Sequence, residues 1–103
     1  MEIRARIELL SSMDGGRLDP LRGSFRPNHK FATADSFSIG EVRQNAQALL
    51  FPGNTIDCVV RFVPESVPPL ATGMRWALYE GPNHLIGYGT VLEVFNNETP
   101  SIG

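Results

Sequence analysis

Apolar and polar residues alternate with a period of two at the start of the chain. From Ile3 to Leu9 every second residue is apolar, and the residues between them are charged. Successive side chains of an extended strand point to opposite faces, so this pattern predicts a strand with one buried and one solvated face. The alternation returns in residues 55–63 and 74–79. Residues 28–34, 37–42 and 85–95 complete the set of predicted strands.

Turn-forming residues separate these segments. The run Ser11–Gly16 combines Ser, Asp and Gly, which favour turns and positive φ, and residues 51–54 read Phe-Pro-Gly-Asn. Three prolines in residues 64–69 exclude regular strand pairing there, because proline has no backbone donor. Inside the last strand, Gly87 and Gly89 indicate a bulge or a close backbone approach.

Residues 41–50 carry good helix formers, so a helix is the alternative there. We favour strand, because the Phe-Pro-Gly-Asn turn leads directly into another predicted strand. About six strands without a convincing long helix predict an all-β fold, either a small closed antiparallel β-barrel or a sandwich. We expect one barrel domain over residues 1–95 and a polar, disordered tail over residues 96–103.

Composition narrows the classes of function. The 103-residue chain has 9 basic and 11 acidic residues and a net charge of -2, so the whole molecule does not attract phosphate. Cys58 is the single cysteine, which excludes an internal disulfide framework and a multi-cysteine zinc site. No apolar run of about 20 residues is present, and we expect a cytoplasmic protein with no membrane segment.

Residues with catalytic or metal-binding chemistry are few. Cys58 lies on the inward side of its predicted strand, which favours a small core residue over a nucleophile. His29 and His84 are far apart in sequence without an evident third ligand, so they are interpreted as solvated turn histidines. Asp14 and Asp19 lie in a turn, where capping is their ordinary role. We therefore expect no enzyme, no metal and no cofactor.

A basic run is the best candidate for chemistry. Residues 17–30 contain five basic side chains interleaved with Phe25, and Phe31 follows them: Arg17, Arg22, Arg26, His29 and Lys30. Such a composition suits phosphate contact combined with base stacking. The more ordinary interpretation is an exposed segment that forms salt bridges and faces a partner, partly neutralised by Asp14 and Asp19.

Several short signatures, taken in order, resemble a known domain. They are Gly15-Gly16-Arg17 to Pro20, Phe25-Arg26-Pro27, Phe51-Pro52-Gly53-Asn54, the run from Gly73 to Gly81, and Gly87-Tyr88-Gly89. At near-matching spacing they resemble the third, C-terminal β-barrel domain of elongation factor Tu over residues 3–95. The resemblance implies a six-stranded barrel that in elongation factor Tu helps hold the T-stem of aminoacyl-tRNA and packs on the GTPase domain.

The chain departs from the family's pattern at positions on which the family's function would depend. Residues 79–84 lack both arginines of the family's last hairpin, although Glu80 and Gly81 remain, and Ser24-Phe25 replaces a Gly-Tyr step. Nothing in the chain resembles the GTPase domain. The resemblance therefore predicts the fold more strongly than it predicts tRNA binding.

Three functions remain open. The leading hypothesis is a non-catalytic module that binds a protein partner, linked to translation. The alternative is an RNA- or tRNA-binding module that uses residues 17–30, and the third is an unrecognised enzyme or ligand-binding barrel. The candidate partner- or RNA-binding residues are Arg17, Arg22, Arg26, Lys30, Glu80 and Gly81.

A candidate apolar interface completes the predictions. Apolar residues on turns, loops or outward strand positions are more numerous than a small monomer needs to expose. We expect several of them to form one patch, buried in a homodimer or in a partner complex, with the proline-rich loop 64–69 at its rim. The residues chosen are Val59, Leu70 and Tyr79, with Phe51, Val63 and Val67 as further members.

Overall fold

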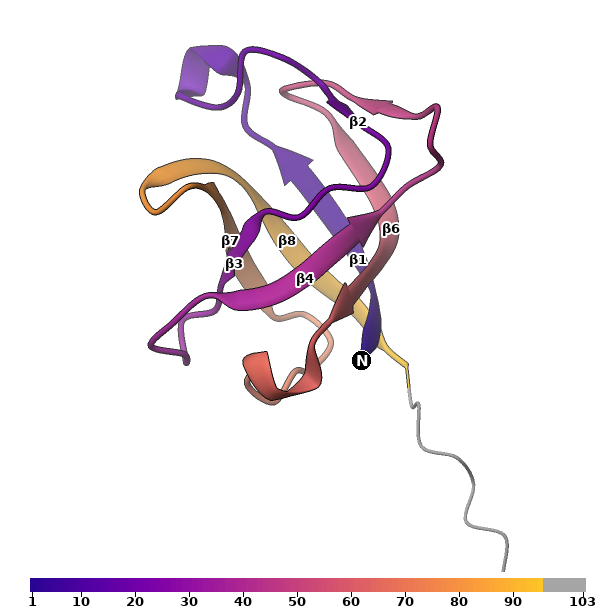
Figure 1. Ribbon diagram of the computed structural model, residues 1–103, viewed down its shortest axis with the longest axis vertical. Coiled ribbons are helices and arrows are strands. Elements are labelled where there is room, and N and C mark those ends of the chain that lie inside the picture. The colour runs from indigo at the N-terminus through magenta and orange to yellow at the C-terminus, as the bar shows by residue number, and fades with distance from the viewer. Residues whose placement is uncertain (96–103) are drawn as a thin grey trace, which may run out of the picture.

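The computed structural model describes residues 1–95 and shows an all-β fold (Figure 1). The predicted tail, residues 96–103, lies outside the described residues. Six strands form a closed antiparallel barrel: β1 (Glu2–Leu9), β3 (Asn28–Lys30), β4 (Ser38–Arg43), β6 (Thr55–Phe62), β7 (Arg75–Glu80) and β8 (His84–Val94). Their order around the barrel is β1-β6-β4-β3-β7-β8, and β8 pairs with β1 to close it.

A small extension lies beyond one end of this barrel. Strands β2 (Leu21–Arg22) and β5 (Leu49–Leu50) form a separate two-stranded sheet there, beside the short 3-10 helix η1 (Ser12–Asp14). A second 3-10 helix, η2 (Pro64–Ser66), begins the proline-rich connection between β6 and β7 at the other end. The closed barrel predicted from the sequence is confirmed.

Most of the predicted strands are present, and two segments differ in detail. Strand β3 ends at Lys30, well short of residue 34, because the chain turns at Phe31, whose carbonyl accepts a hydrogen bond from Ala34 N at 3.1 Å. Residues 41–50 form no helix: β4 continues to Arg43 and β5 follows a short turn. Strand pairing with β6 on one side and with Phe25 on the other thus overrides helix propensity.

The core fills the barrel with the residues that the alternation placed inward. On β1 these are Ile3, Ala5, Ile7 and Leu9, all buried as predicted. The remaining buried apolar residues are Phe31, Val42, Leu50, Val60, Phe62, Trp76, Leu78, Ile86 and Val91. Trp76 packs nearly parallel to Phe31, with ring centroids 5.1 Å apart, and meets Phe62 edge-on at 6.1 Å. Aromatic packing therefore links β6, β7 and the end of β3.

The interpretation of His29 as a solvated turn histidine is wrong, because this residue is fully buried on β3. The indole N–H of Trp76 donates to His29 Nδ1 at 3.0 Å, and His29 Nε2 donates to the carbonyl of Gly40 at 3.0 Å. Since an indole can only donate, Nδ1 must be the acceptor and the proton lies on Nε2. Burial lowers the pKa of His29 to about 4, so the ring is neutral at pH 7.

The two glycines of β8 give the close approach that their positions predicted. A side chain on Gly87 would lie 2.2 Å from the carbonyl oxygen of Glu8 on the neighbouring strand. A side chain on Gly89 would lie 2.5 Å from the indole ring of Trp76. Both glycines thus face the interior, and Gly89 leaves the space that the indole fills.

The described residues include no helix with the length and hydrophobicity that crossing a membrane would require.

We expect Gly89→Ala to destabilise the fold by about 2 kcal/mol, because the added methyl group overlaps the Trp76 ring in a closely packed core. Urea unfolding followed by circular dichroism measures the change. Thr90→Ala is the matched control, since Thr90 lies next to Gly89 on the outer side of β8 and is half-buried. Equal stability of Gly89→Ala and wild type would show that the indole does not fill this space.

The second prediction concerns pH. His29 has a folded-state pKa of about 4 against an ordinary value of 6.5, so the unfolded chain binds a proton between these values that the folded protein does not. Stability is therefore fully present above pH 6.5 and falls as the pH drops toward 4, by about 3 kcal/mol in total. His29→Gln, which keeps a donor and an acceptor, should lose most of this dependence in urea unfolding at several pH values. If the stability of His29→Gln falls with decreasing pH as much as that of the wild type, the assignment of this pH dependence to His29 is wrong.

Candidate functional site

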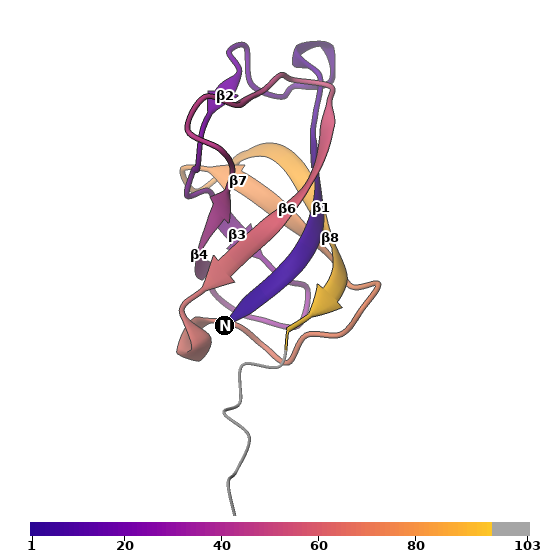
Figure 2. The same ribbon diagram turned by 90° about the vertical axis from the view of Figure 1, so that its right-hand side faces the viewer.

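Strands β1, β6 and β4 are neighbours on one side of the barrel (Figure 2). Their outer face is called the charged wall, because it carries the ion-paired residues Glu2, Arg4, Arg6, Glu41, Arg43 and Asp57. Arg6 and Asp57 make a bidentate pair, with Nε and Nη2 donating to the two carboxylate oxygens at 2.8 and 3.1 Å. This hydrogen bonding lowers the pKa of Asp57. Arg4 lies 3.5 Å from Glu93, an ion pair without a hydrogen bond of ordinary length. Side chains of opposite charge thus lie next to each other on this side of the barrel.

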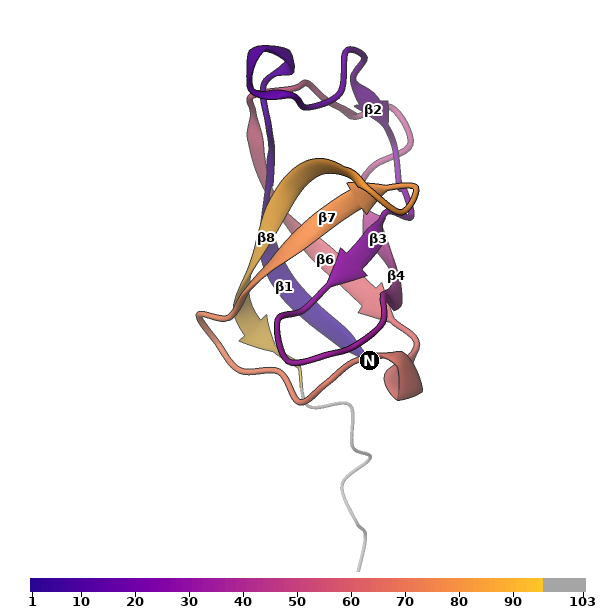
Figure 3. The ribbon, with the colours of Figure 1, turned by 90° about the vertical axis from the view of Figure 1, so that its left-hand side faces the viewer.

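Strands β3, β7 and β8 are neighbours on another side of the barrel (Figure 3). Their outer face is called the aromatic wall, because it carries Tyr79, Tyr88 and the ring of Phe37. Trp76 and Leu78 point inward on β7, so Ala77 and Tyr79 face outward. The ring of Phe37 packs against Tyr79 with centroids 5.8 Å apart. On β8 the Tyr88 ring lies beneath the guanidinium of Arg75, 4.2 Å from it. Partly exposed aromatic rings of this kind are typical of protein interfaces.

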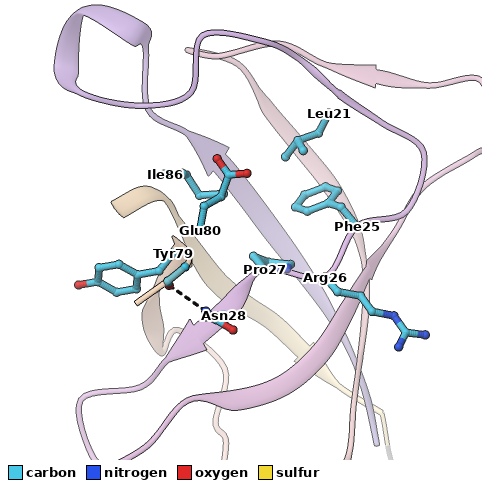
Figure 4. A pocket seen from close by; sticks show the side chains of 9 residues that line it. Leu21, Phe25, Arg26, Pro27, Asn28, Tyr79, Glu80 and Ile86 are labelled. Carbon is cyan, nitrogen blue, oxygen red and sulfur yellow. Dashed lines mark hydrogen bonds between the residues drawn. The ribbon is translucent and has the colours of Figure 1, made fainter. Parts of the chain in front are cut away.

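A pocket of about 270 Å³ lies at the upper end of the aromatic wall (Figure 4). Residues 21–28 form one side of it and the β7–β8 hairpin forms the other. Figure 4 shows Leu21 and Phe25 across the pocket from Ile86, with the Glu80 carboxylate between them. The pocket lining consists of Leu21, Phe25, Arg26, Pro27, Asn28, Tyr79, Glu80, Gly81 and Ile86. Its lining thus combines apolar and aromatic side chains with the charged or amide groups of Arg26, Asn28 and Glu80.

Three contacts hold residues 15–28 against the β7–β8 hairpin, and together they are called the clasp. Arg17 forms an ion pair with Glu80, and its Nε also donates to the carbonyl of Asp19 at 3.1 Å. Asn28 Nδ2 donates to the carbonyl of Gly81 at 2.8 Å, as the dashed line in Figure 4 marks. His84 Nε2 donates to the carbonyl of Gly15 at 2.8 Å. The clasp fixes the width of the pocket.

The structure brings together some of the residues selected from the sequence. Arg26, Tyr79, Glu80 and Gly81 line the pocket, and Arg17 adjoins it through its ion pair with Glu80. These residues come from segments more than fifty positions apart, and the antiparallel pairing of β3 with β7 makes them neighbours.

Two other candidates lie away from the pocket. Arg22 is exposed on β2. Lys30 is at the far end of β3, where its ammonium group donates to the carbonyls of Phe31, at 3.0 Å, and Ala34. The basic run is thus not one continuous cationic strip, because Arg17 is paired, Lys30 holds a turn and His29 is buried and neutral.

The three residues chosen for an apolar interface do not lie together. Val59 is on β6 in the charged wall, opposite Arg4 and Arg43 in the strand register. Tyr79 is on β7, three strands from β6 in either direction around the barrel. Leu70 is in the connection between η2 and β7, where it packs against the core, as does Val67. Tyr79 is the member that adjoins a pocket.

Sequence reasoning missed several residues of the pocket. Asn28 follows the Arg-Pro step directly and could have been found from that motif, but its hydrogen bond to Gly81 depends on the fold. Ile86 is buried beside a bulge at which the register of β7 and β8 shifts, so alternation alone does not place it. Leu21 belongs to the two-stranded sheet, whose two-residue strands are too short to show a period.

Other reactive groups have ordinary structural roles. Cys58 is partly buried against the core, and burial raises the pKa of its thiol to about 12, so the thiolate is scarce at neutral pH. Among the described residues there is no group of three His, Cys, Asp or Glu side chains placed to hold a metal ion.

We expect the Arg17–Glu80 pair to contribute a coupling free energy of about 0.5–1 kcal/mol in a double-mutant cycle of alanine substitutions, since its side chains are 21% and 39% exposed and water screens them in part. Urea unfolding of the two single variants and the double variant measures it. The Arg4–Glu93 pair is the matched control, because its groups are more exposed and lie 3.5 Å apart, and its coupling should be near zero. Equal coupling in both cycles would argue against a special role for the clasp.

Comparison with known proteins supports the resemblance drawn from the motifs. The chain is 34% identical over 90 residues to Elongation factor Tu 2 of Streptomyces avermitilis, an alignment that covers 87% of this chain and 22% of that protein. The chain therefore spans about a fifth of the length of this relative. No protein-family model matches the chain. The sequence similarity and the closed six-stranded barrel together confirm the resemblance to the C-terminal barrel of elongation factor Tu.

Proposed function

We propose that this barrel is a non-catalytic module that binds a protein partner through the pocket and the adjoining aromatic wall. One observation carries the proposal: Tyr79 belongs to both surfaces, because it lines the pocket and packs against Phe37 on the wall. Tyrosine is enriched among the residues that dominate protein interfaces, since it combines a large apolar surface with a polar group. A partner side chain that enters the pocket would contact Tyr79 and the apolar side chains of Phe25 and Ile86.

The state of the cations favours a protein over RNA at this site. Phosphate binding depends on basic side chains that are free to neutralise the backbone, and Arg17 is already paired with Glu80. Of the pocket-lining residues, Arg26 is the one with a positive charge, and Glu80 places a carboxylate between the walls. The net charge of -2 adds no long-range attraction for RNA.

We further propose that the partner is a component of the translation machinery or a factor that acts on it. This step rests on the similarity to Elongation factor Tu 2, of which the chain spans 22%. The barrel would present to the partner a surface shaped like the corresponding part of that factor. The pocket is lined by apolar side chains beside polar ones, which suits a protein loop that offers an apolar side chain together with hydrogen-bonding groups.

A pull-down from a lysate of the source organism tests the proposal. Proteins retained by the wild type should be retained at least about tenfold less by Tyr79→Glu, because a charge at a central aromatic position typically costs more than 1.4 kcal/mol of binding free energy. Thr55→Glu is the matched control, since Thr55 is exposed on the charged wall and takes the same negative charge. Circular dichroism checks that each variant folds, and Tyr79→Ser is the milder substitute.

Two outcomes would overturn the proposal. One is a partner that binds wild type and Tyr79→Glu equally well. The other is micromolar binding of structured RNA that weakens steeply with salt and is lost on charge reversal of both Arg22 and Arg26, which would favour the RNA-binding alternative. We expect no such RNA binding.

A further inference from the structure

A second hollow, of about 240 Å³, crosses strand β4 and shares only Arg26 with the lining of the pocket; it is called the β4 groove. Two buried residues, Gly40 and Phe62, form its floor. The rims carry residues of two kinds, apolar Ile39 and Val63 and charged Arg26, Glu41 and Arg61. The groove is lined by the charged wall and not by the aromatic wall, so it is separate from Tyr79.

Both residues of the apolar rim are exposed. Ile39 is 61% exposed and Val63 is 44% exposed, although each lies beside a buried residue of its own strand or turn. Their backbones are joined, because Val63 N donates to the carbonyl of Ile39 at 2.8 Å. Two branched apolar side chains therefore lie next to each other in water. Covering them would remove apolar surface from water, which is favourable.

The apolar rim is also held rigidly. The hydroxyl of Ser66 accepts a hydrogen bond from Ile39 N and donates to the carbonyl of Val63, both at 2.8 Å. On the inner side, Ser38 Oγ donates to the carbonyl of Ser66 at 2.7 Å. Helix η2 is thus fastened to β4 where Ile39 and Val63 meet. A fixed surface binds a ligand with less loss of conformational entropy than a mobile one.

Positive charge exceeds negative charge at the groove. Glu41 lies between two arginines: Arg26 Nε donates to it at 3.4 Å, and Arg61 is its direct partner in the register of β4 and β6. Arg43 approaches the same carboxylate at 3.7 Å and approaches Glu2 at 3.8 Å. Glu2 is also opposite Arg61, so two carboxylates face three guanidinium groups.

The guanidinium groups of Arg26 and Arg61 are held more loosely than that of Arg6. Arg6 makes a bidentate pair with Asp57, whereas the side chain of Arg26 is 76% exposed and has a single long hydrogen bond to Glu41. Within residues 1–95 Arg61 has no ion pair within 4 Å. A guanidinium with unused donors binds carboxylates in a bidentate way.

We propose that the β4 groove binds an acidic segment of a protein partner, with an apolar side chain packed on Ile39 and Val63 and carboxylates paired with Arg26 and Arg61. Charge complementarity selects this occupant, because the groove combines an excess of positive charge with an apolar rim. A phosphate backbone would gain nothing from the apolar rim, whereas an acidic protein segment can place an apolar side chain on it. A second copy of the chain would carry the same arginines to the contact in any two-fold arrangement centred on the groove.

A labelled hexapeptide with two leucines between pairs of glutamates is a direct probe. We expect saturable binding in fluorescence anisotropy, with NMR amide shifts at Ile39, Arg61 and Val63. Arg61→Glu and Arg26→Glu should each weaken binding about tenfold or more, because a favourable pair becomes a like-charge contact. Arg4→Glu is the matched control: it makes the same charge reversal on the same wall but outside the groove, and binding should stay within about twofold.

Further measurements distinguish this proposal from the other interpretations. The Tyr79→Glu variant should bind the hexapeptide like the wild type, so failure of the pocket and failure of the groove are distinguishable. The proposal is wrong if a peptide with glutamines in place of glutamates binds equally well, or if Arg4→Glu weakens binding as much as Arg61→Glu. It is also wrong if a structured RNA hairpin displaces the peptide at physiological salt, or if light scattering shows that the shifts at Ile39 and Val63 come from self-association.

Discussion

The buried side chain of His29 links three strands where the pairing around the barrel is shortest. Strand β3 is three residues long and pairs with β4 through two residue pairs, Asn28 with Ile39 and His29 with Ser38, which is the weakest seam in the barrel. The His29 ring adds a hydrogen bond across this seam to Gly40 and accepts one from Trp76 on β7. Each nitrogen of the buried imidazole has a hydrogen-bond partner. The ring therefore joins β3, β4 and β7 where few residues pair through their backbones.

The short seam also explains where the binding surfaces lie. Because β3 covers only part of β4, the preceding segment can pair with β4 in its place, and Phe25 exchanges backbone hydrogen bonds with Val42. Arg26 is thereby fixed beside β4, where it lines both the pocket and the β4 groove. The pocket is then completed by the clasp to the β7–β8 hairpin. The pocket and the β4 groove are thus both related to the short pairing between β3 and β4.

The sequence allowed the fold to be predicted further than the site. Alternation places the inward residues of β1, β6 and β7 because each strand has one solvated face, and the glycines of β8 point to a close approach. The same logic fails for His29, because a histidine in a three-residue strand has no period to show that it is buried. It also fails for Glu80, whose ion pair with Arg17 joins positions 63 residues apart. Contacts of that kind depend on register and hairpin geometry, which a single sequence does not specify.

The position of the single tryptophan has a spectroscopic consequence. The Trp76 indole contacts β8 at Gly89, packs against Phe31 and Phe62, and shares a hydrogen bond with β3, so it meets elements from both sides of the seam. Its fluorescence therefore reports at once on packing, on hydrogen bonding and on whether the barrel is closed. A separation of β3 from β7 would expose the ring to water and shift its emission to longer wavelength without any label.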